Sequence, residues 1–248
     1  MKYYAATDVG KVRKQNEDSV YACDERIGCL PNLFLVADGM GGEKGGEVAS
    51  SLAIEKILAS VKSNGRVDPA QIILSAIKTA NIAVHHRATE DNTLSGMGTT
   101  IVAASIVGSS LFVFNVGDSR LYLIRDGLKQ ITKDHSLVEE LVKAGKLSRD
   151  SEEYINNKNI ITKAIGSSDN VEPDFFRIDL LPGDRILLCS DGVTNTVTDE
   201  KIAAILSTQA DLKDLVESLI KTGIDNGGVD NLTAILVDPE ISEVDTWC

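Results

Sequence analysis

The order of the predicted elements constrains the fold of this chain more than any other feature. Amphipathic helices come in pairs between blocks of consecutive short strands, whereas a doubly wound parallel sheet would need strands and helices to alternate. Between Thr99 and Ile131, short β-branched runs are separated by turn residues, which predicts a meander of antiparallel strands. We therefore expect an α+β protein in which antiparallel sheets carry helices on their faces.

Hydrophobic periodicity defines the individual elements. The predicted helices are one around residues 54–61, one that begins at Asp68-Pro69, a short one capped by Ser136 and Glu139, and two after Cys189, the second over 212–220. The predicted strands outside the meander are Lys2–Thr7, Ser19–Asp24, Leu33–Ala37, Phe175–Asp179, Arg185–Cys189 and Leu232–Val237.

The 248 residues contain no Pro/Ser-rich linker and no internal repeat, so we expect one domain over residues 1–240 and a C-terminal tail over 241–248. The formal net charge of −12 argues against a nucleic-acid-binding protein, because phosphate backbones attract basic surfaces. No apolar segment approaches the ~18 residues of a membrane span, and no signal peptide is apparent. The four cysteines lack metal-ligand spacing and are interpreted as reduced thiols of a cytoplasmic protein.

An aspartate stands at one end of four predicted strands, usually beside a glycine. Asp38, Asp118 and Asp191 follow apolar runs, whereas Asp230 precedes one. A single Asp-Gly pair is an ordinary turn. If the four strand ends converge, however, the carboxylates lie close together and need a cation to stay ionised. Ligands that are all oxygen atoms favour Mg²⁺ or Mn²⁺ over zinc.

Motifs for other phosphate and acyl-transfer chemistries are absent from the sequence. There is no Cys-x5-Arg loop, no Asp-x-Asp-x-Thr nucleophile motif and no P-loop ending, and three histidines are too few for a histidine-rich two-metal site. Asp134-His135-Ser136 contains the residue types of a catalytic triad. Because neighbours in sequence point apart, we interpret it as a strand-to-helix junction.

Six motifs, in order along nearly the whole chain, resemble those of the protein phosphatase type 2C family, the metal-dependent protein phosphatases. They are Arg13-x-x-Asn16-Glu17-Asp18, Asp38-Gly39-Met40-Gly41-Gly42, Gly96-Met97-Gly98-Thr99-Thr100, Asn115-Val116-Gly117-Asp118-Ser119-Arg120, Ser190-Asp191-Gly192 and Gly228-Val229-Asp230-Asn231-Leu232-Thr233. The short chain without insertions is similar to the bacterial branch. The resemblance implies a four-layer α-β-β-α sandwich with two central, mainly antiparallel sheets flanked by helix pairs.

The resemblance also implies roles for particular residues. Asp38 would bridge two Mn²⁺ or Mg²⁺ ions, with the Gly39 carbonyl on the first ion and Asp191 and Asp230 on the second. Asp118, together with Asp191, matches the position of a third ion.

Two further positions match groups near the phosphate. Glu17 would act on the metals through water. Arg13 matches the arginine that binds the substrate phosphate, for which its forked guanidinium is suited.

The implied function is that of a phosphoserine/phosphothreonine protein phosphatase in which a metal-activated water hydrolyses the phosphomonoester. Its partners would be phosphorylated proteins and a cognate Ser/Thr kinase, and we expect a monomer. One alternative is an enzyme dedicated to a single regulatory protein, such as an anti-sigma-factor antagonist. Another is a catalytically inactive phosphoprotein-binding module, against which the retained Asp38, Asp191 and Asp230 argue.

Two positions depart from the family pattern. Met40 stands where the eukaryotic branch has its general-acid histidine, and Glu43 stands where many bacterial relatives have histidine. We interpret Glu43 as a solvated residue near a helix start, with a metal-bound water as the acid. The polar segment Lys146–Asn159 has no periodic apolar face and matches the family's flap beside the active site.

Overall fold

The computed structural model describes residues 1–241, with the side chains of Glu43, Lys44 and Ile155 excepted. The predicted tail therefore lies, apart from Ile241, outside the described residues. Ile241 itself is buried against the core.

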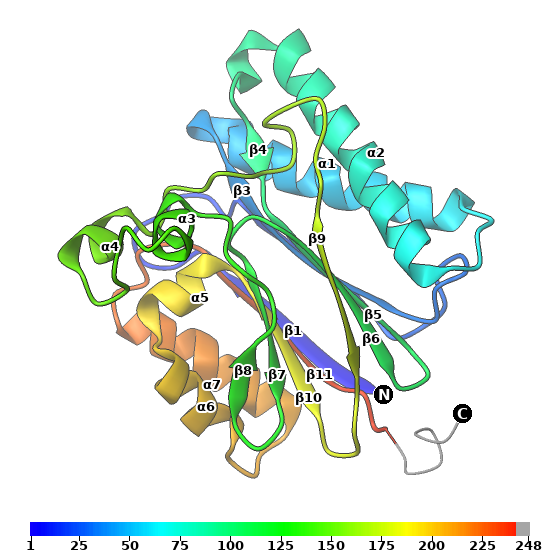
Figure 1. Cartoon of the computed structure of the whole chain (residues 1–248), viewed down its shortest axis with the longest axis vertical. Helices are drawn as coiled ribbons and strands as arrows, with labels where there is room; N and C mark the ends of the chain where they lie inside the picture. Colours follow the sequence, from blue (N-terminus) through cyan, green and yellow to red (C-terminus); the bar gives the residue numbers. More distant parts are fainter. Residues whose placement is uncertain (242–248) are drawn as a thin grey trace.

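Two antiparallel sheets lie face to face at the centre of the molecule (Figure 1). The first has the order β1 (Lys2–Asp8), β11 (Leu232–Asp238), β10 (Arg185–Cys189), β7 (Arg120–Ile124) and β8 (Leu128–Gln130). The second has the order β2 (Asp18–Cys23), β3 (Leu33–Met40), β5 (Ile101–Val107), β6 (Ser110–Val116) and β9 (Asp174–Asp179), and β4 (Gly98–Thr99) pairs with the end of β3.

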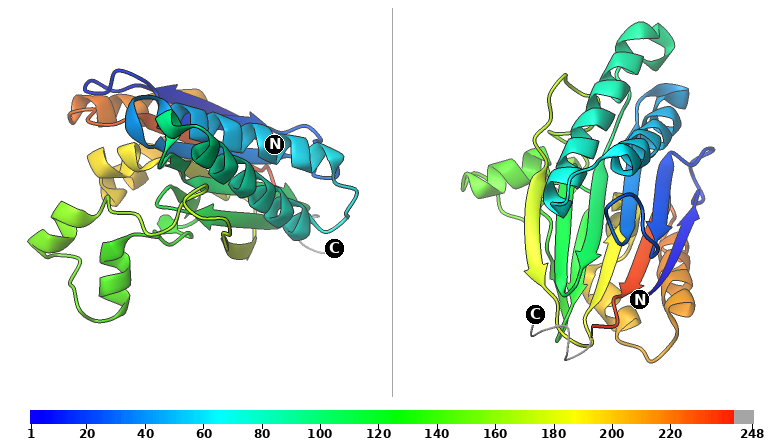
Figure 2. Two further views of the ribbon diagram at one scale, coloured as in Figure 1. Left: turned by 90° about the horizontal axis from the view of Figure 1, so that it is seen from above. Right: turned by 90° about the vertical axis from the view of Figure 1, so that its right-hand side faces the viewer.

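Helices cover the outer face of each sheet (Figures 1 and 2). Helices α1 (Gly42–Ser63) and α2 (Pro69–Glu90) pack on the second sheet, and α5 (Asp191–Thr196), α6 (Asp199–Leu206) and α7 (Leu212–Asp225) pack on the first. The remaining helices are the 3-10 helix η1 (Asn92–Leu94), α3 (Leu137–Lys143) and α4 (Glu152–Asn157). The predicted four-layer α-β-β-α sandwich is therefore confirmed.

Strand alternation accounts for the layers, because successive side chains of a strand point to opposite faces. In β3, Leu33, Leu35 and Ala37 join the core under α1 and α2. Phe34 and Val36, between them, join the core between the two sheets. A third core lies under α5–α7.

Local capping signals operate as the sequence predicts. Pro69 is the first residue of α2, and the carboxylate of Asp68 accepts a hydrogen bond from the Ala70 amide. The Ser136 hydroxyl accepts one from the Glu139 amide at the start of α3.

Two short α-helices and the 3-10 helix η1 were not predicted. Helix α4, capped by Ser151, lies within the polar segment 146–159, and α5 begins at Asp191. Each has six residues, which is too short for an apolar face to repeat. Among residues 1–241, no helix combines the length and the apolar character that crossing a bilayer requires.

Candidate metal centre and active site

Five aspartates converge where strands of the two sheets end. Burial raises the pKa of Asp38 well above its ordinary value, and the nearby carboxylates add to this effect. The carboxylates that act on Asp38 are those of Asp18, Asp191, Asp118 and Asp230. The structure thus brings together the four aspartates singled out in the sequence, and adds Asp18.

Asp38 is held rigidly by its main chain. Its amide donates a 2.9 Å hydrogen bond to the Thr100 hydroxyl, and its carbonyl accepts bonds from the Thr100 amide and the Thr99 hydroxyl, both at 2.8 Å. Strand β3 continues through Asp38 to Met40, three residues beyond the predicted end. The carboxylate therefore projects from regular, hydrogen-bonded backbone.

Gly39 allows α1 to approach this strand. A Cβ atom at this position would lie 2.1 Å from the Gly46 carbonyl oxygen and 2.6 Å from that of Glu17. The Gly39 amide donates to the same Glu17 oxygen at 3.1 Å. Only glycine permits this contact between β3, the start of α1 and the segment that carries Glu17.

A second glycine brings Asp191 and Asp230 together. A Cβ atom on Gly192 would lie 1.9 Å from the Asn231 carbonyl oxygen, so the first turn of α5 packs directly on the start of β11. Burial raises the pKa of Asp191, and Asp230 raises it further. The Asn195 side chain donates to Asp191 Oδ2 at 2.9 Å and orients this carboxylate.

Asp118 lies in the turn between β6 and β7 and is 7% exposed. Burial raises the pKa of Asp118 to about 8, with smaller contributions from Asp191 and Asp134. The structure therefore places Asp118 beside Asp191, the pairing that the resemblance implies for a third ion.

Arg13 and Glu17 lie beside Asp230. Arg13 Nη2 is 2.9 Å from Asp230 Oδ2, and Nη1 is 3.4 Å from Glu17 Oε2. The Glu17 amide donates to the Asn231 side-chain oxygen at 2.8 Å, and burial raises the pKa of the Glu17 carboxyl. The Arg13 side chain is 45% exposed and thus lies at the solvent side of the cluster.

Asp18 is the member of the cluster that sequence reasoning missed as a site residue. It is 8% exposed, and burial raises its pKa to about 7. Its Oδ2 accepts from the Ser190 hydroxyl at 2.7 Å, while Oδ1 has no hydrogen-bond partner among the described residues. The available signal was its place beside Glu17 in the first motif and directly before the predicted strand Ser19–Asp24.

The donor set fits a hard divalent cation. The carboxylates lie so close together that the pKa of Asp38 is raised, and one buried carboxylate oxygen, Asp18 Oδ1, has no hydrogen-bond partner among the described residues. A bound Mg²⁺ or Mn²⁺ would stabilise both arrangements. Within residues 1–241, no three Asp, Glu, His or Cys side chains are grouped tightly enough to hold an ion by themselves. Arg13 engages one oxygen of Asp230, and backbone carbonyls or water would have to complete the coordination.

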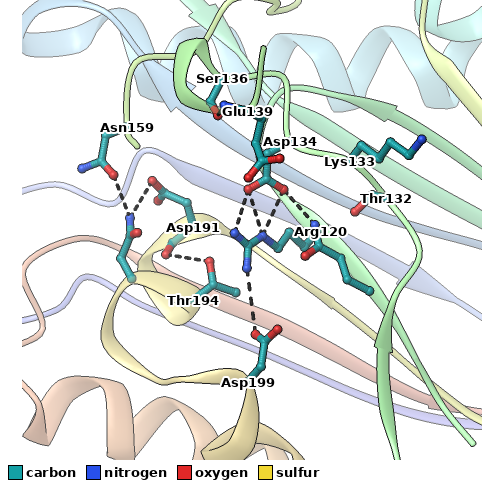
Figure 3. Close-up of polar contacts among 12 residues, drawn as sticks. Arg120, Thr132, Lys133, Asp134, Ser136, Glu139, Asn159, Asp191, Thr194 and Asp199 are labelled. Carbon is teal, nitrogen blue, oxygen red and sulfur yellow. Dashed lines mark hydrogen bonds and ion pairs between the residues drawn. The ribbon is translucent and has the colours of Figure 1, made fainter. Parts of the chain in front are cut away.

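A cavity of about 150 Å³ adjoins Asp118 and Asp191. Its lining includes the ion pair between Arg120 and Asp134, in which the guanidinium donates at 2.7–3.1 Å (Figure 3). One wall contains Asp118 and Asp191. The segment 146–159 also lines the cavity, through Tyr154, Lys158 and Asn159.

Of the two positions that depart from the family pattern, Met40 and Glu43, the structure describes the side chain of Met40. Met40 is half-buried and pairs with Gly98 in the β3–β4 ladder. The side chain of Glu43 lies outside the described part of the structure, so its interpretation stays a prediction.

Comparison with known proteins agrees with this geometry. Residues 11–237 match the family described as Protein phosphatase 2C. The serine/threonine phosphatase stp of Listeria monocytogenes is 35% identical over 242 residues, covering 96% of this chain and 95% of the relative. The crystal structure of the Mycobacterium tuberculosis serine/threonine phosphatase PstP/Ppp superposes with a TM-score of 0.85 at 38% identity, covering 96% of this chain and 98% of the other.

A second PstP structure, of the catalytic domain in complex with two manganese ions, superposes with a TM-score of 0.83 at 36% identity over 95% of this chain and 96% of the other. The sequence match, the shared fold and the ordered motifs agree. This chain belongs to the protein phosphatase 2C family.

Proposed function

We propose that this chain is a metal-dependent phosphoserine/phosphothreonine protein phosphatase whose aspartate cluster holds the catalytic cations. The observation that carries the proposal is the crowding of Asp38 by four other carboxylates, which burial makes costly unless cations are bound. The names of its relatives, stp and PstP among them, support the same activity. The retained cluster argues against an inactive phosphoprotein-binding module.

Asp38 is the group that lies between two Mn²⁺ or Mg²⁺ ions in this proposal. The Gly39 carbonyl would serve the first ion, and Asp191 and Asp230 the second. The proximity of Asp38, Asp191 and Asp230 supports the assignment, as does the manganese content of the PstP catalytic-domain structure. When bound, the cations supply a hydroxide-forming water near neutral pH and offset negative charge on the phosphate.

Asp118 and Asp191 would hold a third ion at the edge of the cavity. The Asp191 carboxylate contributes to the raised pKa of Asp118, which supports the pairing. Glu17 would contribute through water; its position beside Asp230 and Arg13 supports this role.

Arg13 would bind the phosphate group of the substrate. Its fork matches two phosphate oxygens, and its exposure leaves it accessible to a phosphoprotein. Its present contacts with Asp230 and Glu17 aim the guanidinium at the cluster. Arg13 would then orient the ester and offset charge on the equatorial oxygens during hydrolysis.

The segment 146–159 would recognise the peptide around the phosphorylated residue. Helices α3 and α4 project from the body of the molecule (Figure 2), and α4 forms one wall of the cavity. Residues in this wall can contact a bound peptide without touching the phosphate. We further propose that residues 1–240 form one phosphatase domain that acts as a cytoplasmic monomer opposite a Ser/Thr kinase.

Hydrolysis of a phosphothreonine peptide tests this function. The purified chain, stripped with chelator, should be inactive and should release phosphate once Mn²⁺ is added, whereas an inactive module would bind the peptide without turnover. Arg13→Ala should raise KM for the peptide, because the guanidinium binds the phosphate. Full activity in excess chelator would contradict the proposal.

A further inference from the structure

His135 lies in the junction before α3, behind the turn that carries Asp118. We propose that His135 is a positioning residue, which clamps the backbone at Gly117 and thereby fixes the Asp118 carboxylate beside Asp191. This inference rests on the proposed role of Asp118 and deepens it.

The clamp consists of two hydrogen bonds on opposite sides of Gly117. The Gly117 amide donates to His135 Nδ1 at 3.0 Å, and the His135 amide donates to the Gly117 carbonyl at 3.0 Å. Both peptide units that flank Gly117 are therefore tied to the same residue. The second of these units leads directly into Asp118.

The glycine itself leaves little freedom for other arrangements of the turn. Its φ is +105°, and a Cβ atom there would lie 2.6 Å from the methyl carbon of Thr100. The Thr100 hydroxyl in turn accepts a hydrogen bond from the Asp38 amide. The turn that carries Asp118 is thus packed on the residue that holds Asp38, and His135 closes it from the other side.

The ring of His135 is held in one orientation by its second nitrogen. Nε2 lies 3.2 Å from Asp174 Oδ1 on β9, and the side chain is 12% exposed. Lys163 lies 3.4 Å from the same nitrogen and donates to the Glu172 carbonyl at 2.9 Å. Because Nδ1 accepts a hydrogen bond from a backbone amide, the ring proton belongs on Nε2, which lies beside the Asp174 carboxylate. This is the pattern by which an outer residue orients a group near a metal.

Other groups cannot replace the clamp. The Asn115 side chain also donates a hydrogen bond to the Gly117 carbonyl, at 3.1 Å. For the Gly117 amide, however, His135 Nδ1 is the only hydrogen-bond acceptor described in residues 1–241. Without Nδ1, this amide would be left unpaired in a buried turn, which favours rotation of the peptide that precedes Gly117. Such a rotation would displace Asp118 from Asp191.

Two amide variants separate the roles of the ring nitrogens. His135→Asn places an oxygen close to the position of Nδ1 and can still accept the Gly117 amide, whereas His135→Gln places its amide near Nε2 and cannot. Calorimetric titration of the stripped protein with Mn²⁺ is the readout. We expect His135→Gln and His135→Leu to weaken the binding step that depends on Asp118 by ~10-fold or more, as for other outer residues of metal sites, and His135→Asn to stay close to the wild type.

The exposed His86 on α2 supplies a matched control, because its side chain pairs only with Glu90 among the residues that the structure describes. His86→Leu should leave Mn²⁺ binding unchanged. Thermal unfolding of each variant reports on folding. If His135→Leu fails to fold, the contrast between the Asn and Gln variants carries the test. Equal loss in both amide variants would overturn the inference.

A double-mutant cycle distinguishes this inference from the proposed function. If Asp118→Ala leaves Mn²⁺ binding and peptide turnover intact, the third-ion assignment is wrong. If Asp118→Ala weakens one binding step but His135→Gln does not, the assignment stands and the positioning role is wrong. The expected result is that His135→Gln has no further effect on Mn²⁺ binding in the Asp118→Ala background.

Discussion

Asp18 and Asp38 lie directly opposite each other in the antiparallel pairing of β2 with β3. Like charges at such a pair of positions normally destabilise a sheet. Burial raises the pKa of both residues, and the Asp18 carboxylate raises the pKa of Asp38 further. The protein therefore carries unfavourable electrostatics at the end of this ladder, where bound cations would compensate for it.

The first prediction concerns the free-energy cost of burying the Asp38 carboxylate beside the other carboxylates. Asp38→Asn removes one carboxylate without changing side-chain size, so in excess chelator the variant should be more stable than the wild type by about 1 kcal/mol, in the range of other charge optimisations. Addition of Mn²⁺ should raise the unfolding temperature of the wild type by more than that of the variant, which keeps Asp118 and Asp191 but lacks the bridging carboxylate. Thermal unfolding with and without Mn²⁺ measures both effects. A variant that is less stable in chelator would indicate that Asp38 has a structural role instead.

The second prediction concerns pH and the link between α3 and α4. Glu139 accepts hydrogen bonds from Arg149 at 2.6 and 3.0 Å and from the Tyr154 hydroxyl, and the bond from Arg149 lowers the pKa of Glu139. A carboxyl whose pKa is lower in the folded state stabilises it above the unfolded-state pKa and loses this contribution as pH falls. We therefore expect α4 amides to lose protection from hydrogen exchange between about pH 5 and pH 3, after correction for intrinsic rates.

Two substitutions test the origin of this pH dependence. Glu139→Gln should show weakened α4 protection already at pH 7. Glu140→Gln, on the exposed face of the same helix, should behave as the wild type. Equal exchange in all three proteins would show that Glu139 does not hold α4.

The third prediction concerns substrate selectivity. Tyr154 and Lys158 line the same cavity as Asp118 and Asp191. Alanine at both positions should lower kcat/KM for a phosphothreonine peptide by ~10-fold, about 1.4 kcal/mol, because contacts with the peptide are lost. Turnover of p-nitrophenyl phosphate, which has no peptide, should change little. Equal losses on both substrates would assign the segment 146–159 to support of the fold.

The fourth prediction concerns protonation of the leaving group. A serine or threonine alkoxide needs a proton, whereas p-nitrophenolate hardly does. If a metal-bound water supplies it, Glu43→Gln should depress phosphopeptide hydrolysis less than ~10-fold, below ~1.4 kcal/mol in barrier. General acid catalysis is worth ~100-fold or more. A loss of that size on the peptide, with p-nitrophenyl phosphate hydrolysis spared, would identify Glu43 as the acid.

Much of this architecture follows from the sequence because local patterns determine it. Alternation along residues 33–37 defines which side chains face each layer, and Asp68-Pro69 defines where α2 begins. The aspartates at strand ends indicated a shared site because several strands of one sandwich end together. The motif order then identified the family.

The parts that could not be predicted depend on register and on contacts between distant segments. Asp18 joins the cluster because the β2–β3 register places it opposite Asp38. The ion pair of Arg13 with Asp230 joins residues 217 positions apart. Helices α4 and α5 are too short to show a period, and nothing in Asp134-His135-Ser136 indicates that the ring of His135 contacts Gly117.

Turnover of a phosphothreonine peptide by the stripped protein, titrated with Mn²⁺ and compared with Asp191→Asn, tests the central claim most directly. The wild type should be inactive in chelator and recover as Mn²⁺ is added. The variant keeps the size of the side chain but loses its charge, and should remain lower by ~100-fold or more at the same Mn²⁺ concentrations, because altering outer residues of a metal site already costs ~10- to 100-fold. Undiminished turnover in chelator, or in the Asp191→Asn protein, would contradict the account.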